Sequence, residues 1–127
     1  MSFTNFLETE ILDHVFAGAA YTAPSTKYLA LFTAVSNGET GSVTELSGSA
    51  YARQSVAFTT SGNTTSNNAA VEFPTATGSW GTVTHVGVYD ASTSGNLMAY
   101  ATLSSSKAID TGDVFRVPSG DLDITLN

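Results

Sequence analysis

The sequence predicts a mostly β protein: an antiparallel β-sandwich or jelly roll with one short N-terminal amphipathic helix. Charged residues make up only 12% of the 127 residues, about half the share found in an average soluble domain. Thr, Val, Tyr and Phe, which favour strands, are frequent, whereas the long-chain helix formers are scarce. Short apolar segments alternate with turn-rich segments at intervals of roughly 8–15 residues, a spacing typical of sandwiches. We expect one domain, residues 1–127.

The helix is expected over about residues 4–16. Apolar residues recur there at helical spacing, while polar side chains occupy the other side. Ser2 or Thr4 can cap its start, and Gly18 can end it. The apolar stripe consists of Phe3, Phe6, Leu7, Ile11, His14 and Val15.

The rest of the chain, from about residue 27 to 126, is expected to form strands. The segment "KYLALFTAV" (27–35) is apolar on both alternation phases, which predicts cover on both faces, with the opposite sheet and the N-terminal helix as the candidate covers. Residues 36–49 read as a polar loop, and a hairpin is expected around Asp110–Asp113. Further strands are expected at 50–60, 69–73, 81–90, 97–104 and 121–127, the last with Leu122, Ile124 and Leu126 inward.

The apolar phase changes within the strand expected at 81–90. Val83 occupies an odd position, whereas Val86 and Val88 occupy even positions. Either both faces are covered, or a bulge changes the register. Gly87 fits a bulge or the close approach of another backbone.

The charge pattern excludes some partners. The net charge is −7, and the four basic residues, Lys27, Arg53, Lys107 and Arg116, are scattered along the chain. No basic stripe is available to meet phosphates, so we expect no nucleic-acid binding. The acidic balance is consistent with solubility or with a basic protein partner.

Redox and membrane features are also expected to be absent. The chain has no cysteine, so neither a disulfide nor a thiolate metal site is expected. The segment "MSFTNFLETEILDHVFAGAA" lacks a basic start and carries three acids, so no secretion signal is expected. No apolar run approaches the roughly 18 residues needed to cross a bilayer.

The two histidines do not predict catalysis. Asp90 lies about 16 Å from His85 along an extended strand, and no serine stands in a known nucleophile motif. His14 falls on or beside the apolar stripe of the helix. The carboxylates at 110–113 and 121–123 do not match a calcium loop. We therefore predict no catalytic residues, no cofactor and no metal site.

Large side chains in the segment "GSWGTVTHVGVYDAS" (78–92) suit either a core or an interface. Trp80 and Tyr89 are of the kind enriched at interfaces, and they serve equally well as core residues. His85 is interpreted as a residue on a packed or subunit-facing strand surface. The candidate interface residues are Phe3, Phe6, Leu7, Ile11, Trp80, His85 and Tyr89.

Four segments carry a resemblance to a known family: "YLALFTA", "GSAYARQSVAF", "TSNNAAVEFPTATGSWGTVTHVGVYDASTSGNLMAYATL" and "SGDLDITL". They resemble small virion proteins of tailed bacteriophages, often labelled tail fibre proteins, and are similar to capsid cement or decoration proteins. The most specific part is the W-G-x-V-T-H-V-G-[VI]-[YF]-D pattern, here Trp80–Asp90. The resemblance implies a β-sandwich or jelly roll that self-associates, as a homotrimer, without catalytic activity.

The resemblance leads to an expected function. The first hypothesis is a capsid cement protein, assembled in the host cytoplasm, that binds the major capsid protein on the outer virion surface and stabilises the shell. The N-terminal segment serves either as the trimer contact or foot on the shell, or simply as cover for its own sheet. The alternative is a tail or tail-fibre-associated structural or host-adhesion protein. A small β-sandwich enzyme is a third class, for which no site is found.

Overall fold

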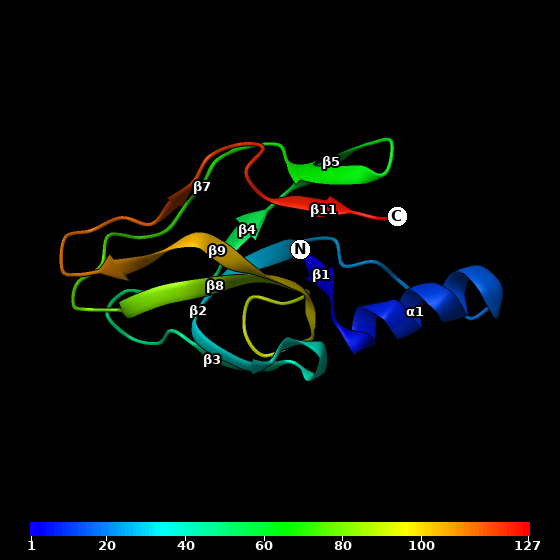
Figure 1. Cartoon of the computed structure of the whole chain (residues 1–127), viewed down its shortest axis with the longest axis horizontal. Coiled ribbons are helices and arrows are strands. Elements are labelled where there is room, and N and C mark those ends of the chain that lie inside the picture. Colours follow the sequence, from blue (N-terminus) through cyan, green and yellow to red (C-terminus); the bar gives the residue numbers. More distant parts are fainter.

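Eleven short strands, one α-helix and one 3-10 turn make up the computed structural model, which describes residues 1–127 (Figure 1). The first part of the chain contains β1 (Ser2–Phe3), α1 (Asn5–Phe16), β2 (Lys27–Asn37), η1 (Gly38–Thr40), β3 (Ser42–Glu45) and β4 (Gln54–Val56). The second part contains β5 (Phe58–Ser61), β6 (Thr64–Asn67), β7 (Val71–Glu72), β8 (Gly81–Tyr89), β9 (Leu97–Ile109), β10 (Arg116–Val117) and β11 (Asp123–Thr125).

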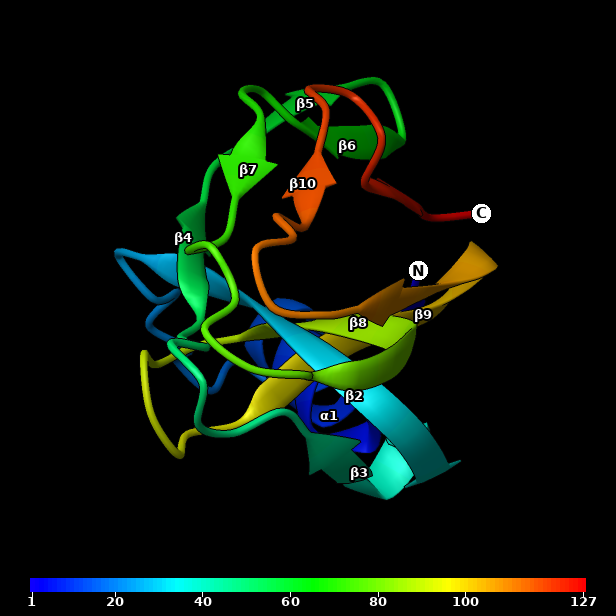
Figure 2. The ribbon, with the colours of Figure 1, turned by 90° about the vertical axis from the view of Figure 1, so that its left-hand side faces the viewer.

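The strands form two layers, as the sequence predicts for a β-sandwich. The larger sheet has the order β1-β9-β8-β2-β3, with β4 paired to the start of β2. The second layer holds the three-stranded sheet β11-β6-β5 and the pair β10-β7. Figure 2 shows the second layer above the first, with β4 rising between them. All pairings are antiparallel. The narrower jelly-roll assignment stays a prediction.

Strand β2 is covered on both faces, as its two apolar phases predict. Leu29 and Leu31 belong to the main core of 16 buried residues between the layers. Ala30 and Phe32 belong to a second cluster of four on the opposite face. The expected cover for this second face was wrong, because α1 contributes no member to the cluster. Partly buried residues of β2, β3 and β9 pack there instead.

A register irregularity in β8 explains the change of apolar phase. Val83 pairs with Lys107 and His85 pairs with Thr102, so two steps along β8 face five steps along β9. The irregularity brings Val83 into the same core as Val86 and Val88. Both alternatives therefore hold: the register shifts between β8 and β9 at this point, and both faces of β8 are covered, since Tyr89 belongs to the second cluster.

Gly87 is closely approached, but by side chains rather than by another backbone. A Cβ at this position would lie 2.6 Å from Phe32 and 2.7 Å from Leu97. The absent side chain leaves the space in which these two residues pack on the second face of the sheet.

Several expected elements differ from the structure. The polar stretch 36–49 contains η1 and β3, which pairs with β2. The strand expected at 50–60 is divided into β4 and β5. The turn at Asp110–Asp113 forms, but β10 beyond it pairs with β7, so the expected hairpin was wrong. Leu126, expected to face inward, is 54% exposed.

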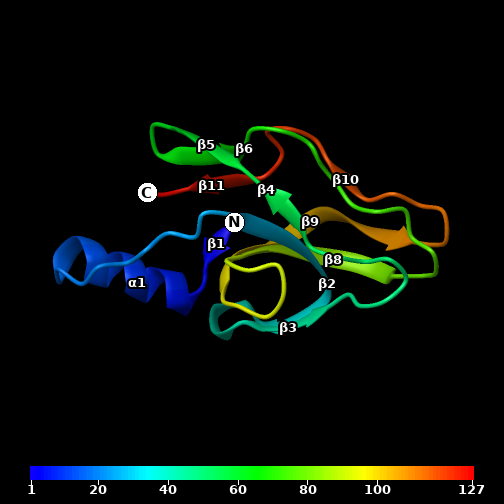
Figure 3. The ribbon, with the colours of Figure 1, turned by 180° about the vertical axis from the view of Figure 1, so that it is seen from behind.

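Helix α1 begins and ends near the predicted residues. The Thr4 hydroxyl accepts a hydrogen bond from the Leu7 N–H and donates one to the Leu97 carbonyl, so it caps the helix and fastens it to β9. At the other end Gly18 adopts a φ of +73°, and the N–H groups of Ala17 and Ala19 both donate to Asp13 O. Figures 1 and 3 show that α1 projects beyond the two layers.

Candidate functional site

Two accessible features of the surface are candidates for function: the projecting helix α1 and a groove between the layers. Both are carried by a body whose polar interior is satisfied, since no buried side-chain nitrogen or oxygen lacks a hydrogen-bond partner. The interior therefore leaves no side-chain polar group in need of an outside partner, and the candidates for contact lie on the surface.

Arg53 connects several loops of that body. Its guanidinium forms a bidentate ion pair with Glu45, at 2.9 and 2.8 Å, and lies 3.6 Å from the centre of the Tyr89 ring. It also donates to the carbonyls of Ala91 and Ser94 in the β8–β9 turn. The Arg53 side chain is only 7% exposed, so these contacts lie in a partly dry environment that strengthens them.

Tyr51 joins this cluster to the aromatic core. Its hydroxyl donates to Glu45 at 2.7 Å and accepts the Leu31 N–H at 3.1 Å. Its ring stacks on Phe73 and meets Trp80 edge to face. Burial raises the pKa of Tyr51 far above its usual value of 10.0, so the hydroxyl remains a donor to the carboxylate.

Six of the seven predicted interface residues fall into two groups in the structure. Trp80 and Tyr89 are buried, in the main and second clusters respectively. The Trp80 indole Nε1–H donates to the Ser49 carbonyl at 2.9 Å, and the Arg53 guanidinium lies over the Tyr89 ring, so both aromatic residues have partners inside the chain. The accessible group, at the N-terminus, consists of Phe3, Phe6, Leu7 and Ile11, all half-buried.

His85 is half-buried at the register irregularity. Its Nδ1 lies 2.7 Å from the Thr84 hydroxyl, and that hydroxyl also donates to the carbonyl of Thr33 at 3.1 Å. Its cross-strand neighbours are Phe32 and Thr102. These contacts hold the His85 side chain against its neighbours in the sheet. Its role at an interface stays a prediction.

The N-terminal helix leaves a set of apolar side chains without cover. It has no buried residue, and it contacts β1, β9 and η1. Phe6 and Leu7 pack on the edge of the main core. Beyond them the helix exposes three large apolar side chains: Leu12 at 56%, Val15 at 60% and Phe16 at 81%. These three side chains lie on the same part of the helix, which makes it a candidate contact site.

The arm is tied back to the body after the helix ends. The Tyr21 N–H donates to His14 Nδ1 at 3.2 Å, and the Tyr21 hydroxyl lies 3.9 Å from the Met98 sulfur. Together with the contacts of Thr4 at the start of α1, these bonds fix the orientation of the helix relative to the sheets. We call residues 4–21 the N-terminal arm.

The groove lies where β9 departs from β8. Its volume is about 410 Å³, within the range of about 300–1,000 Å³ typical of ligand sites. The side chains that line it come from β8, β9 and the segment around β10 and β11. They include Val86, Leu103, Ser104, Ser105, Lys107, Phe115, Arg116, Val117, Asp121 and Leu122.

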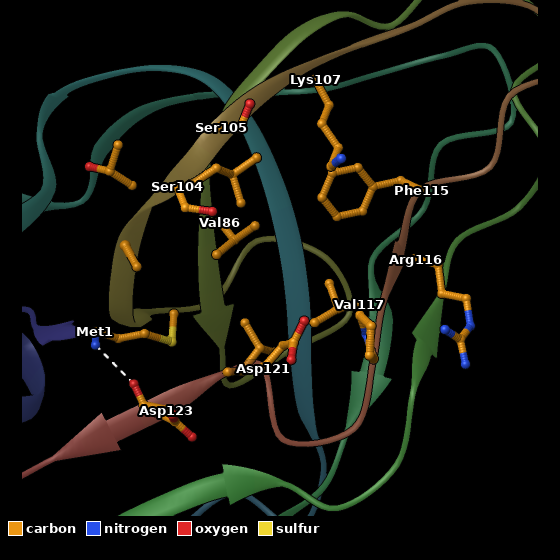
Figure 4. Close-up of a pocket in the computed structure, with 15 residues that line it drawn as sticks. Met1, Val86, Ser104, Ser105, Lys107, Phe115, Arg116, Val117, Asp121 and Asp123 are labelled. Atoms are coloured by element: carbon orange, nitrogen blue, oxygen red, sulfur yellow. Dashed lines mark hydrogen bonds between the residues drawn. The ribbon is translucent and has the colours of Figure 1, made fainter.

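Apolar side chains form the floor of the groove and charged side chains lie at its rim. Figure 4 shows Lys107 beside Phe115, with Arg116 at the same side and Asp121 and Asp123 toward the other. Lys107 and Arg116 form no ion pair, since the chain has only the one between Arg53 and Glu45. The sequence alone did not reveal this groove, because it depends on the additional residues in β9 and on the pairing of β10 with β7.

The carboxylates and histidines do not gather into a metal site. No group of three or more His, Cys, Asp or Glu side chains is placed to hold an ion. Asp110 and Asp113 bond within their own turn, where the Asp110 N–H donates to the Asp113 carboxylate at 2.9 Å. The Asp123 carboxylate accepts a hydrogen bond from Ser66. The structure contains no helix with the length and apolar character needed to cross a bilayer.

Fold and surface together define a β-sandwich module with a projecting helix that exposes apolar side chains and a groove with apolar and charged lining. The family model described as podophage GP4 fiber I protein gp80 matches residues 2–125, and the chain belongs to this family. The family consists of phage virion structural proteins rather than a class of enzymes. No curated protein matches the chain.

Proposed function

We propose that this protein is a structural subunit of a phage fibre, held in the assembly by its N-terminal arm. The observation that carries the proposal is the family match over residues 2–125, whose description names a fibre protein. The exposed apolar side chains of α1 support it, because a projecting amphipathic helix is a common means of attachment between protein subunits.

The internal contacts of the body fit a mechanical role. The hydrogen bonds of Arg53 to the carbonyls of Ala91 and Ser94 and the stack of Tyr51 on Phe73 connect segments that lie apart in the chain. A subunit of this kind presents its contact surfaces in a fixed geometry. Weak contacts repeated within one assembly then add up, because each later contact is effectively intramolecular.

A capsid decoration protein is the second candidate. The resemblance of Trp80–Asp90 to cement proteins favours it, as does the presence of a single projecting foot on a compact body. In this role the N-terminal arm binds the major capsid protein on the outer shell, the subunits form homotrimers, and the shell is stabilised against internal pressure.

Location in the particle separates the two candidates. Gold-labelled antibodies against the protein should bind the fibres of intact particles in electron micrographs. Label confined to the capsid surface would overturn the fibre proposal and support decoration. In that case, purified protein added to shells that lack it should raise their heat resistance. The absence of label from every part of the particle would contradict both candidates.

A further inference from the structure

Several polar side chains that line the groove have no hydrogen-bond partner within the chain. They include the Ser104 hydroxyl, the Lys107 ammonium and the Asp121 carboxylate, all of which are exposed. The floor below them is apolar and contains Val86 and Phe115, which are buried in the main core. The groove therefore places free donors and acceptors around an apolar floor, a composition typical of sites for small polar ligands.

Lys107 and Asp121 lie on opposite sides of the groove without pairing. Figure 4 shows Lys107 beside Phe115 and Asp121 toward the other side, and the one ion pair of the chain joins other residues. A chemical group that lies between them must accept a hydrogen bond from the ammonium and donate one to the carboxylate. A hydroxyl group does both, whereas a phosphate or a carboxylate only accepts and an ammonium only donates. Ser104 adds a further hydroxyl partner to this wall.

Size and charge argue against other occupants of the groove. Its volume of about 410 Å³ is typical of small-molecule sites, whereas a protein partner commonly covers about 800 Å² of surface. A simple anion is repelled by Asp121 and a simple cation by Lys107. A wholly apolar molecule would remove water from both charged groups without replacing their hydrogen bonds. The lining therefore suits a neutral molecule with several hydroxyl groups and an apolar face.

We propose that the groove binds a small neutral saccharide. A pyranose ring carries hydroxyl groups around its edge and C–H groups on its faces. The C–H face packs on the floor near Val86 and Phe115, and the hydroxyls bridge Lys107 and Asp121 through charge-assisted hydrogen bonds. No residue of the N-terminal arm lines the groove, so this site goes beyond the assembly role proposed above and does not depend on it.

An NMR titration of the full chain tests the proposal. The probes are the neutral sugars glucose, galactose, mannose and N-acetylglucosamine and the disaccharides lactose and maltose. At least one of them should shift the amide signals of Ser104, Lys107 and Asp121 in a saturable manner. The amide of Ser92, in the β8–β9 turn outside the groove, should not shift. Absence of saturable shifts in the groove with every probe would overturn the proposal.

Single variants test the two hydrogen-bonding charges. Lys107→Ala and Asp121→Ala each remove one charged partner of the sugar, so either change should weaken binding by about tenfold or more. Both side chains are exposed, so the variants should fold normally. Asp110→Ala is the matched control, because Asp110 is an exposed carboxylate outside the groove, and it should bind as the wild type does. Equal affinity of all three variants would contradict the proposed site.

Two further probes separate a saccharide from simpler ligands. Sorbitol carries hydroxyl groups but no ring face, so its shifts should be weaker than those of the best sugar. Sodium phosphate tests whether Lys107 binds an anion by itself, and it should also act more weakly. Shifts as strong from either probe would overturn the proposal. A negative result with the sugars would leave the virion role standing, because antibody labelling of particles tests that role separately.

Discussion

The cluster around Arg53 and the N-terminal arm differ in how completely their side chains find partners within the chain. In the cluster, the Arg53 guanidinium finds a carboxylate, two carbonyls and an aromatic ring within one chain. In the arm, Leu12, Val15 and Phe16 find no such cover. One region is complete inside the chain and the other is not. The first region therefore contributes to the fold, and the second is the one to which our proposal assigns assembly.

Removal of the Arg53 side chain should give the largest loss of stability. Arg53→Ala leaves Glu45 without its ion pair and releases the β8–β9 turn. We expect the free energy of unfolding to fall by roughly 2–4 kcal/mol. The loss stays at or below the range for fully buried pairs because the Glu45 side chain keeps 23% exposure. Urea unfolding monitored by tryptophan fluorescence measures this loss.

Arg116→Ala provides the matched control, because Arg116 is exposed and forms no ion pair. Its effect should stay within about 0.5 kcal/mol. Glu45→Ala combined with Arg53→Ala should cost less than the sum of the single changes. Equal effects of Arg53→Ala and Arg116→Ala would contradict the importance of the cluster.

The close packing at Gly87 provides a second test of the folded core, with a smaller expected effect. A methyl group at this position would meet Phe32 and Leu97 at 2.6 and 2.7 Å. Gly87→Ala should therefore destabilise the protein by about 1–3 kcal/mol through overpacking. Thr82→Ala, at an exposed position of the same strand, should have almost no effect. Thermal unfolding of the two variants would compare them, and equal melting temperatures would contradict the close contact.

High pH should lower the stability of the folded protein, because its buried tyrosines resist ionisation. Burial raises the pKa of Tyr51 and of Tyr89 above their usual value of 10.0. Above about pH 10 the unfolded chain loses these protons while the folded chain retains them. Stability is therefore fully present below pH 10 and falls as the pH rises beyond it. Melting temperatures measured across this range should decrease, less steeply in Tyr51→Phe. A flat profile would contradict the burial of these hydroxyls.

Local sequence patterns predicted the elements whose causes are local. Thr4 and Gly18 marked the ends of α1, and the two apolar phases of β2 predicted cover on both faces. The phase change between Val83 and Val86 pointed to cover on both faces or to a bulge, and the structure has a register shift there. Each of these depends on neighbours within a few residues, so the sequence contains the necessary information.

The sequence did not predict the elements that depend on residues far away in the chain. Strand β10 has only two residues and pairs with β7, more than forty positions earlier in the chain. The contacts of Arg53 with Ala91 and Ser94 also join distant segments. The groove combines both effects, so no local pattern predicted it. For Trp80 and Tyr89, composition fits a core as well as an interface, and only the three-dimensional arrangement shows their burial.

The arm gives the most direct test of the difference between the two regions. Leu12→Ser with Phe16→Ser removes apolar surface from α1, and Leu126→Ser is a matched control because Leu126 is 54% exposed, close to the 56% of Leu12. Light scattering should give the wild-type protein and Leu126→Ser masses that are multiples of 13.1 kDa, and the helix variant 13.1 kDa alone. The urea midpoint of the helix variant should equal that of Leu126→Ser. A wild-type monomer at every concentration, or a helix variant that still assembles or fails to fold, would contradict the account.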